Sequence, residues 1–111
     1  MYKISLNRIH DRVRITEGDE RIELRVDADP MRMVAGLNES QRRLKTLTDE
    51  STEEQQRDAA LYFAGVIFGQ EQAGELLAFY HNDAACVINV CGRYFTDRLS
   101  KLIENVQRRK K

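Results

Sequence analysis

Hydrophobic and polar residues alternate in two stretches of the N-terminal part of the chain. The apolar positions are Val13 and Ile15 in the first stretch and Ile22, Leu24 and Val26 in the second. Alternation with a period of two is typical of strands that bury one face. Gly18 and Asp19 lie between the two stretches and suit a tight turn. We therefore predict an antiparallel hairpin.

An earlier stretch has the same alternation, with Tyr2, Ile4 and Leu6 at every second position. It predicts a further strand that would extend the hairpin into a small meander. A lone hairpin is only marginally stable in water, so we expect this sheet to pack against helices.

A helical period begins after Asp29, which can cap a helix, and Pro30, which fits the first helical position. The pattern then steps by three and four residues, at Met33, Val34, Leu37, Gln41, Leu44 and Leu47. This spacing predicts an amphipathic helix from Pro30 to Thr48, weakened in its middle by Gly36.

An acidic segment separates this helix from the next one. A capping box is available there, formed either by Ser51 with Glu54 or by Thr52 with Gln55. The helix that follows is predicted to end near Gly69, which is a natural C-terminal cap.

Two more helices complete the pattern. A short one is predicted from Glu71 to Tyr80, and the last begins after Asn82 or Asp83 and runs towards the C-terminus. The last helix is amphipathic, with apolar positions at Ala84, Val87, Ile88, Cys91, Phe95, Leu99, Leu102, Ile103 and Val106.

These elements predict an α+β fold in which helices dominate. We expect a single domain over residues 1–111, with a small antiparallel β-hairpin or meander in residues 1–28 and three to four helices in residues 29–111. The length suits one domain with one modest core.

Charge changes the functional picture more than it changes the fold. The chain has 18 basic and 18 acidic residues, so its formal net charge is zero and no overall field attracts nucleic acid or an anionic membrane. No apolar run approaches the roughly 20 residues that cross a bilayer, and the first residues lack the apolar segment of a secretory signal. We therefore expect a cytoplasmic protein with no membrane contact and no preference for nucleic acid.

Basic residues nevertheless gather near the C-terminus, where seven lie between Arg93 and Lys111 against Asp97 and Glu104. Such a tail can complement the helix dipole and keep the end of the chain soluble. It can also contact an acidic partner.

The stretch that most resembles a reactive site runs from His81 to Cys91. Cys86 and Cys91 are five residues apart on a predicted helix, so they point about 140° apart and do not have zinc-ligand spacing. Cys86 lies near a helix N-terminus, which favours a thiolate, but its neighbours in the sequence are apolar and supply no base. We predict two reduced thiols and no enzyme activity, metal or cofactor.

Aromatic residues concentrate in the second half of the chain, which holds seven of the eight. These are Tyr62, Phe63, Phe68, Phe79, Tyr80, Tyr94 and Phe95. One interpretation is a helical core closed by aromatic rings. The other is that some of these rings, with Leu76 and Leu77, form an exposed groove for a helix or an extended peptide.

From Tyr62 to Ile103 the chain resembles the tail assembly chaperones of tailed phages and prophages of Gram-positive bacteria. These small proteins are encoded between the major tail protein and the tape measure protein. The matching residues are Phe63, Phe68, Gly69, Glu71, Gln72, Ala73, Leu77, Tyr80 and Asp83. The N-terminal hairpin, the helix start at Asp29 and the acidic break also fit the pattern.

The resemblance implies a protein that coats the aggregation-prone tape measure protein, helps to recruit tail tube subunits and then leaves the particle. The implied partners are the tape measure protein and the major tail protein, and a second copy of the chain is a further candidate. Many members of the family also have a longer, frameshifted product. The residues expected at the client contact are Phe68, Leu76, Leu77, Phe79 and Tyr80, with the basic tail as a second candidate.

Two other functions remain open from the sequence. One is a structural tail or head-completion subunit that stays in the virion. The other is a small nucleic-acid-binding regulator that uses the basic C-terminal helix.

Overall fold

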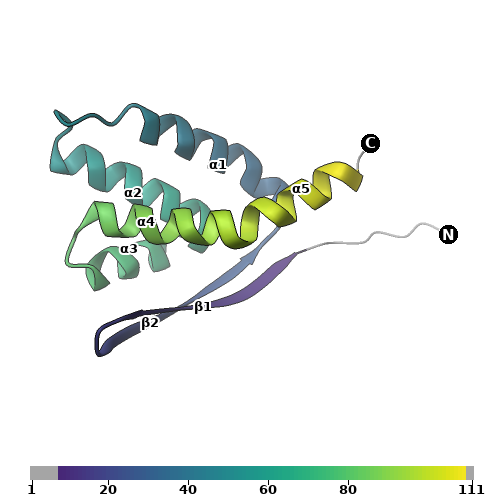
Figure 1. The fold of residues 1–111 in the computed structure, drawn as a ribbon, viewed down its shortest axis with the longest axis horizontal. Helices are drawn as coiled ribbons and strands as arrows, with labels where there is room; N and C mark the ends of the chain where they lie inside the picture. Colours follow the sequence, from purple (N-terminus) through teal and green to yellow (C-terminus); the bar gives the residue numbers. More distant parts are fainter. Residues whose placement is uncertain (1–7, 110–111) are drawn as a thin grey trace.

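The computed structural model describes residues 8–109, and it describes side chains as far as Glu104. A hairpin lies along one side of a layer of helices, as Figure 1 shows. Its strands are β1 (Ile9–Glu17) and β2 (Glu20–Ala28). The helices are α1 (Pro30–Lys45), α2 (Glu53–Phe68), α3 (Gln70–Phe79), α4 (Ala84–Tyr94), the π-helical turn η1 (Phe95–Leu99) and α5 (Ser100–Arg109). The predicted α+β, helix-dominated fold is confirmed.

The hairpin has the predicted strands and turn. Its strands pair antiparallel from Ile9 opposite Ala28 to Glu17 opposite Glu20. Gly18 has φ 60°, which a glycine at the first central position of a type II′ turn adopts without strain. The strand predicted at Tyr2, Ile4 and Leu6 lies outside the described residues.

The helix starts agree with the capping residues in the sequence. The Asp29 carboxylate accepts the Met31 N–H at 3.0 Å. Of the two possible capping boxes, the structure has Thr52 with Gln55, and each side chain accepts the backbone N–H of the other residue. The helix α1 is shorter than predicted because Thr46, whose hydroxyl and N–H both donate to the Arg43 carbonyl, ends it.

The polar residues before α4 form a tight connection. His81 and Asn82 have φ of 55° and 65°, and Asn82 N–H donates to the Leu77 carbonyl at 2.9 Å. The Asp83 carboxylate then accepts the N–H groups of Ala85 and Cys86. These residues therefore end one helix and begin the next.

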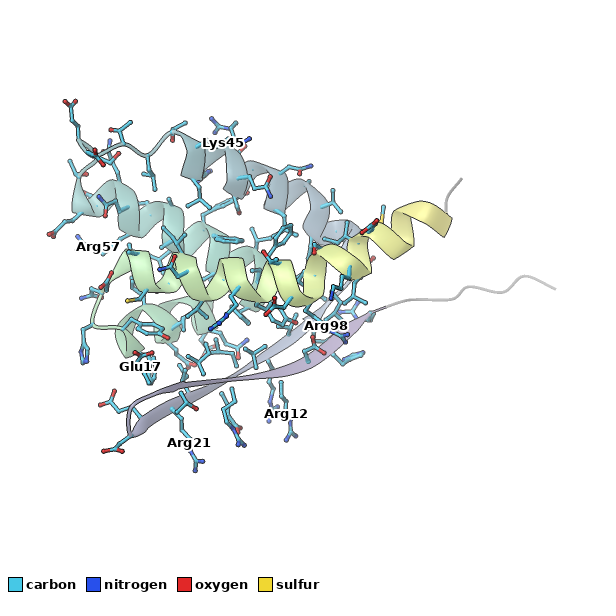
Figure 2. All side chains as sticks on the ribbon, viewed as in Figure 1. Arg12, Glu17, Arg21, Lys45, Arg57 and Arg98 are labelled. Atoms are coloured by element: carbon cyan, nitrogen blue, oxygen red, sulfur yellow. The ribbon has the colours of Figure 1, made fainter. Side chains whose placement is uncertain are left out.

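The C-terminal helix is continuous but irregular, which its sequence pattern did not predict. The turn η1 has π-helical bonding, and such a turn inserts an extra residue into an α-helix and shifts the faces that follow it. Leu99 is fully buried in this turn, and neighbouring Arg98 lies between the helix and the hairpin (Figure 2).

The core lies between the hairpin and the helices. From the hairpin, Leu24 and Val26 of β2 are almost completely buried, at 0% and 1% exposure. They belong to one cluster with Ala60, Phe63, Ala64, Ile67, Phe68, Ala73, Leu76, Leu77, Val87 and Cys91. Burying a side chain of this size contributes about 1.5–3 kcal/mol, so β2 attaches the hairpin to the helices.

Helices α1 and α2 approach closely at Gly36. A Cβ atom at that position would lie 2.9 Å from both methyl groups of Val66. One turn later Ser40 is buried, with its hydroxyl donating to the Gly36 carbonyl. The glycine that weakens the helix in isolation is therefore required by its packing.

Two polar contacts hold the hairpin in place. The Asp11 carboxylate on β1 accepts from the Tyr94 hydroxyl at 2.6 Å and from the Arg98 guanidinium at 2.9 and 3.1 Å. The hydrogen bond from Arg98 holds the pKa of Asp11 below its usual value, although burial acts in the opposite direction. On β2, the Gln72 side-chain amide bonds both the N–H and the carbonyl of Arg25.

We predict that Gly36→Ala lowers the free energy of unfolding by about 1 kcal/mol, because overpacking against Val66 outweighs the gain in helix propensity. The matched control is Gly74→Ala on α3, where an added Cβ has no neighbour within 4 Å. It should gain about 0.5–1 kcal/mol. Urea denaturation measures both, and equal gains from the two substitutions would contradict the close approach.

We also predict that Asp11→Asn destabilises the protein by about 1–2 kcal/mol at neutral pH, since it weakens charge-assisted hydrogen bonds at a half-exposed site. The folded-state pKa of Asp11 is depressed, so its contribution is present above the ordinary pKa of an aspartate and disappears as pH falls through the lower folded value. The difference in unfolding free energy between the two proteins should therefore shrink below about pH 4. Asp97→Asn, an exposed acid on η1, serves as the control; a difference that stays constant to pH 2 excludes this role for Asp11.

Candidate functional site

An open apolar groove lies between α1 and α4, with α2 as its floor. We call it the α1–α4 groove. Its apolar lining consists of Leu44 from α1, Phe63 from α2, Ile88 from α4 and Phe95 at the start of η1. Phe63 is buried beneath, and the other three side chains are half-buried. Part of the apolar surface of these helices therefore faces solvent.

Helical spacing explains how these residues meet. Gln41 and Leu44 are three apart on α1, whereas Ile88, Gly92 and Phe95 follow the i, i+4, i+7 spacing of one helix face. Gly92 has no side chain, and an added Cβ there would have no neighbour within 4 Å. The groove is open at Gly92 because nothing fills that position.

The rim of the groove is polar. It is formed by Gln41, Asn89, Arg93, Thr96 and Asp97, all exposed. On α1, outside the lining of the groove, Glu39 pairs with Arg42 at 2.6 Å and with Arg43 at 3.1 Å. The hydrogen bonds from Arg42 and then Arg43 lower the pKa of Glu39 to about 2. An apolar floor with a charged rim is the usual anatomy of a protein-binding surface.

The expected contact residues do not line this groove. Phe68, Leu76 and Leu77 are buried, at 6%, 0% and 7% exposure, so the expectation that they are exposed to a partner is wrong. They are covered because α3 packs on α2 and the hairpin closes the other side. Phe68 also lies against Tyr94, with ring centroids 5.8 Å apart.

Phe79 and Tyr80 remain half-buried at the end of α3. Their rings meet edge to face at 5.1 Å. Burial raises the pKa of the Tyr80 hydroxyl, and the nearby Glu17 carboxylate on the hairpin raises it further. Two of the five expected residues are thus partly accessible, at the opposite end of α4 from Phe95. Most of the basic tail, the second expected contact, lies outside the described side chains.

The sequence carries part of the signal for the groove. Ile88 and Phe95 are apolar positions of the last helix, and Leu44 is an apolar position of the first helix. What the pattern could not show is that these positions face one another across α2. Periodicity identifies an apolar face, but the tertiary arrangement decides how much of that face is covered.

The two cysteines, Cys86 and Cys91, differ in their exposure to solvent. Cys91 is buried, and burial raises the pKa of its thiol to about 12. Cys86 is half-buried, and its thiol pKa is raised by burial and then by the carboxylates of Asp83 and Glu17. A neighbouring carboxylate disfavours the thiolate, which is the opposite of what a nucleophilic cysteine requires.

The described residues were also compared with the requirements of a metal site and of a membrane-spanning helix. Within residues 8–109, no group of three or more His, Cys, Asp and Glu side chains is placed to hold a metal ion. In the same described part of the chain, no helix has both the length and the apolar character needed to cross a bilayer.

We predict that a disulfide reagent at pH 8 modifies Cys86 more slowly than a free cysteine, because its thiol pKa is raised. Cys91 should react only when the protein unfolds, so denaturant should double the number of thiols modified. Stopped-flow absorbance with the native and denatured protein measures both rates. Rapid modification of native Cys86 at pH 6 would instead indicate an activated thiolate.

No protein-family model, curated protein or solved structure matches this chain.

Proposed function

We propose that the protein is a non-enzymatic binding protein that holds an amphipathic helix of another polypeptide in the α1–α4 groove. The observation that carries this proposal is the exposed apolar line formed by Leu44, Ile88 and Phe95 over buried Phe63. A groove of this kind is a recurring recognition site for helices.

The geometry favours a helix over a small molecule as the occupant. The groove is open along its length, with walls from two helices and a floor from a third. Small-molecule sites are instead concave and bury most of their ligand. A guest helix could place its apolar stripe on Ile88 and Phe95, and its polar side would remain in water beside Asn89 and Arg93.

The family resemblance suggests which polypeptide is bound. A tape measure protein is a long helical chain whose apolar stripes need cover until tail tube subunits assemble around it. On this proposal the protein acts as a tail assembly chaperone in the host cytoplasm, and the groove covers one such stripe. The major tail protein would then displace it, so the chaperone would be missing from finished particles.

The proposal predicts that Gly92→Leu abolishes binding, because a leucine side chain would fill the open space in the groove. Helix propensity favours leucine over glycine, so the variant should remain folded. Gly74→Leu on α3 is the matched control, since its position is also open but lies outside the groove. Co-expression with the tape measure protein measures the effect as soluble, co-purified client.

A second variant tests the apolar contact itself. Ile88→Asp places a charge on the groove wall and should lose at least about tenfold in affinity, whereas Asn89→Asp adds the same charge at the rim and should retain binding. Substitutions at buried Leu77 are unsuitable because they would change folding as well as binding. Equal client recovery with wild type, Gly92→Leu and Ile88→Asp would exclude the groove as the binding site.

The composition of finished particles distinguishes a chaperone from a structural subunit that stays in the virion. Mass spectrometry of purified particles should detect no copies of a chaperone. A constant number of copies per particle would instead identify a structural tail or head-completion protein.

A further inference from the structure

The two edges of the hairpin differ. On the β2 edge, Gln72 bonds the backbone N–H and carbonyl of Arg25, at 2.8 and 2.7 Å. These two groups of Arg25 therefore point away from β1. A side-chain amide in this position acts as a short substitute for a neighbouring strand and blocks the edge where it binds.

The β1 edge carries no such block in residues 8–109. Arg12 lies directly opposite Arg25 in the antiparallel register, so its backbone groups also point away from the partner strand. The same alternation directs the N–H and carbonyl groups of His10, Arg14 and Thr16 to this edge. None of these backbone groups has a hydrogen-bond partner within the described part of the chain. An open row of this kind is a template for strand addition.

Apolar side chains accompany this open edge on the inner face of the hairpin. Val13 and Ile15 of β1 are half-buried, as is Ile22 of β2, whereas Ile9, Leu24 and Val26 are buried. The helices α2 and α3 pack mainly over β2, which leaves part of β1 uncovered. A strand added beside β1 would bury the exposed parts of Val13 and Ile15.

The outer face of the hairpin is rich in arginine. It carries Arg12, Arg14, Arg21 and Arg25, and Figure 2 shows Arg12 and Arg21 pointing away from the helices. Arg14 is paired with Glu23 at 2.8 Å. Arg12 and Arg25 face each other across the strands, and neither has an ion pair among the described residues. Like charges directly opposite one another are unfavourable, so a negative charge beside Arg12 and Arg25 would be stabilising. The acidic residues that this face does carry, Glu23 and Asp27, lie on β2 and are already paired with Arg14 and Arg8.

We propose that β1 binds an extended acidic segment of another protein as a third strand. In the bound segment acidic and apolar residues alternate. The acidic side chains lie on the outer face beside Arg12 and Arg14, and the apolar ones lie on the inner face beside Val13 and Ile15. This inference rests on the hairpin and does not depend on the α1–α4 groove.

The charge pattern disfavours two other occupants. A second copy of the chain, paired through β1 about a two-fold axis at Val13, would place Arg12 beside Arg14 of the other copy. Nucleic acid would meet Glu23 within the arginine patch and the acidic residues of the hairpin tip, Glu17, Asp19 and Glu20. Both occupants therefore bring like charges together, whereas a short strand beside β1 lies next to Arg12 and Arg14 and one strand away from Glu23 and Asp27 on β2.

A labelled peptide in which isoleucine and glutamate alternate, with glycine and serine at its ends, tests the proposal by fluorescence anisotropy. We expect saturable binding at low salt to the full-length protein, and about tenfold weaker binding to Arg12→Glu. Lys45→Glu is the matched control, since it makes the same charge change at the far end of α1 (Figure 2) and should bind like wild type. Thermal unfolding confirms that both variants are folded. No binding by the wild type, or an equal loss with both variants, would overturn the proposal.

Peptide N-methylation tests the backbone part of the contact. The amides of a strand alternate between its two edges, so only one set of amides can point towards β1. Methylation of either the glutamate amides or the isoleucine amides should abolish binding, and methylation of the other set should not. Equal effects of the two methylations would show a contact through side chains only. Tighter binding of duplex DNA than of peptide, or dimerisation that Arg12→Glu alters, would equally overturn the proposal.

Discussion

The side chains of Leu24 and Val26 of β2 are buried against the helices, and this apolar contact attaches the hairpin to the rest of the protein. Without it, the N-terminal part of the chain would not form a stable structure. A two-stranded sheet has too few contacts to persist by itself. Here its inner face packs on α2 and α3, while Asp11 and the backbone of Arg25 are each bound by side chains from distant helices. The apolar contact supplies most of the energy, and the polar contacts define the position of each strand.

The same packing determines which apolar surfaces and which strand edge remain exposed to solvent. The hairpin, α2 and α3 pack together over Phe68 of α2 and over Leu76 and Leu77 of α3. They do not reach the opposite side, where α1 and α4 flank α2 and Ile88 and Phe95 remain half-exposed. Because the helices cover β2 more fully than β1, the outer strand is also left with an open edge. The groove and the open β1 edge thus both remain exposed because the helices and the hairpin cover only part of one another's apolar surface.

Much of the fold could be predicted from local chemistry. Alternation gave the two strands, and Asp29, Thr52 and Asp83 marked helix starts because capping depends on residues close in sequence. Contacts between distant residues could not be predicted in this way. Asp11 meets Tyr94 and Arg98 across more than 80 positions, and Gly36 is explained only by Val66. The burial of Leu76 and Leu77 could not be predicted for the same reason: a leucine at helical spacing has the same sequence pattern whether a neighbouring element covers it or not.

Native-state hydrogen exchange can establish whether the hairpin and helices form one cooperative unit. We expect the β1–β2 ladder amides beside Leu24 and Val26 to exchange as slowly as those of α2 and α4, and to respond to denaturant with the same slope. Exchange of the outward amides of β1 should be fast, since that edge is open. Fast exchange throughout the hairpin, with the helices still protected, would contradict the account, because the hairpin would then be a loosely attached element.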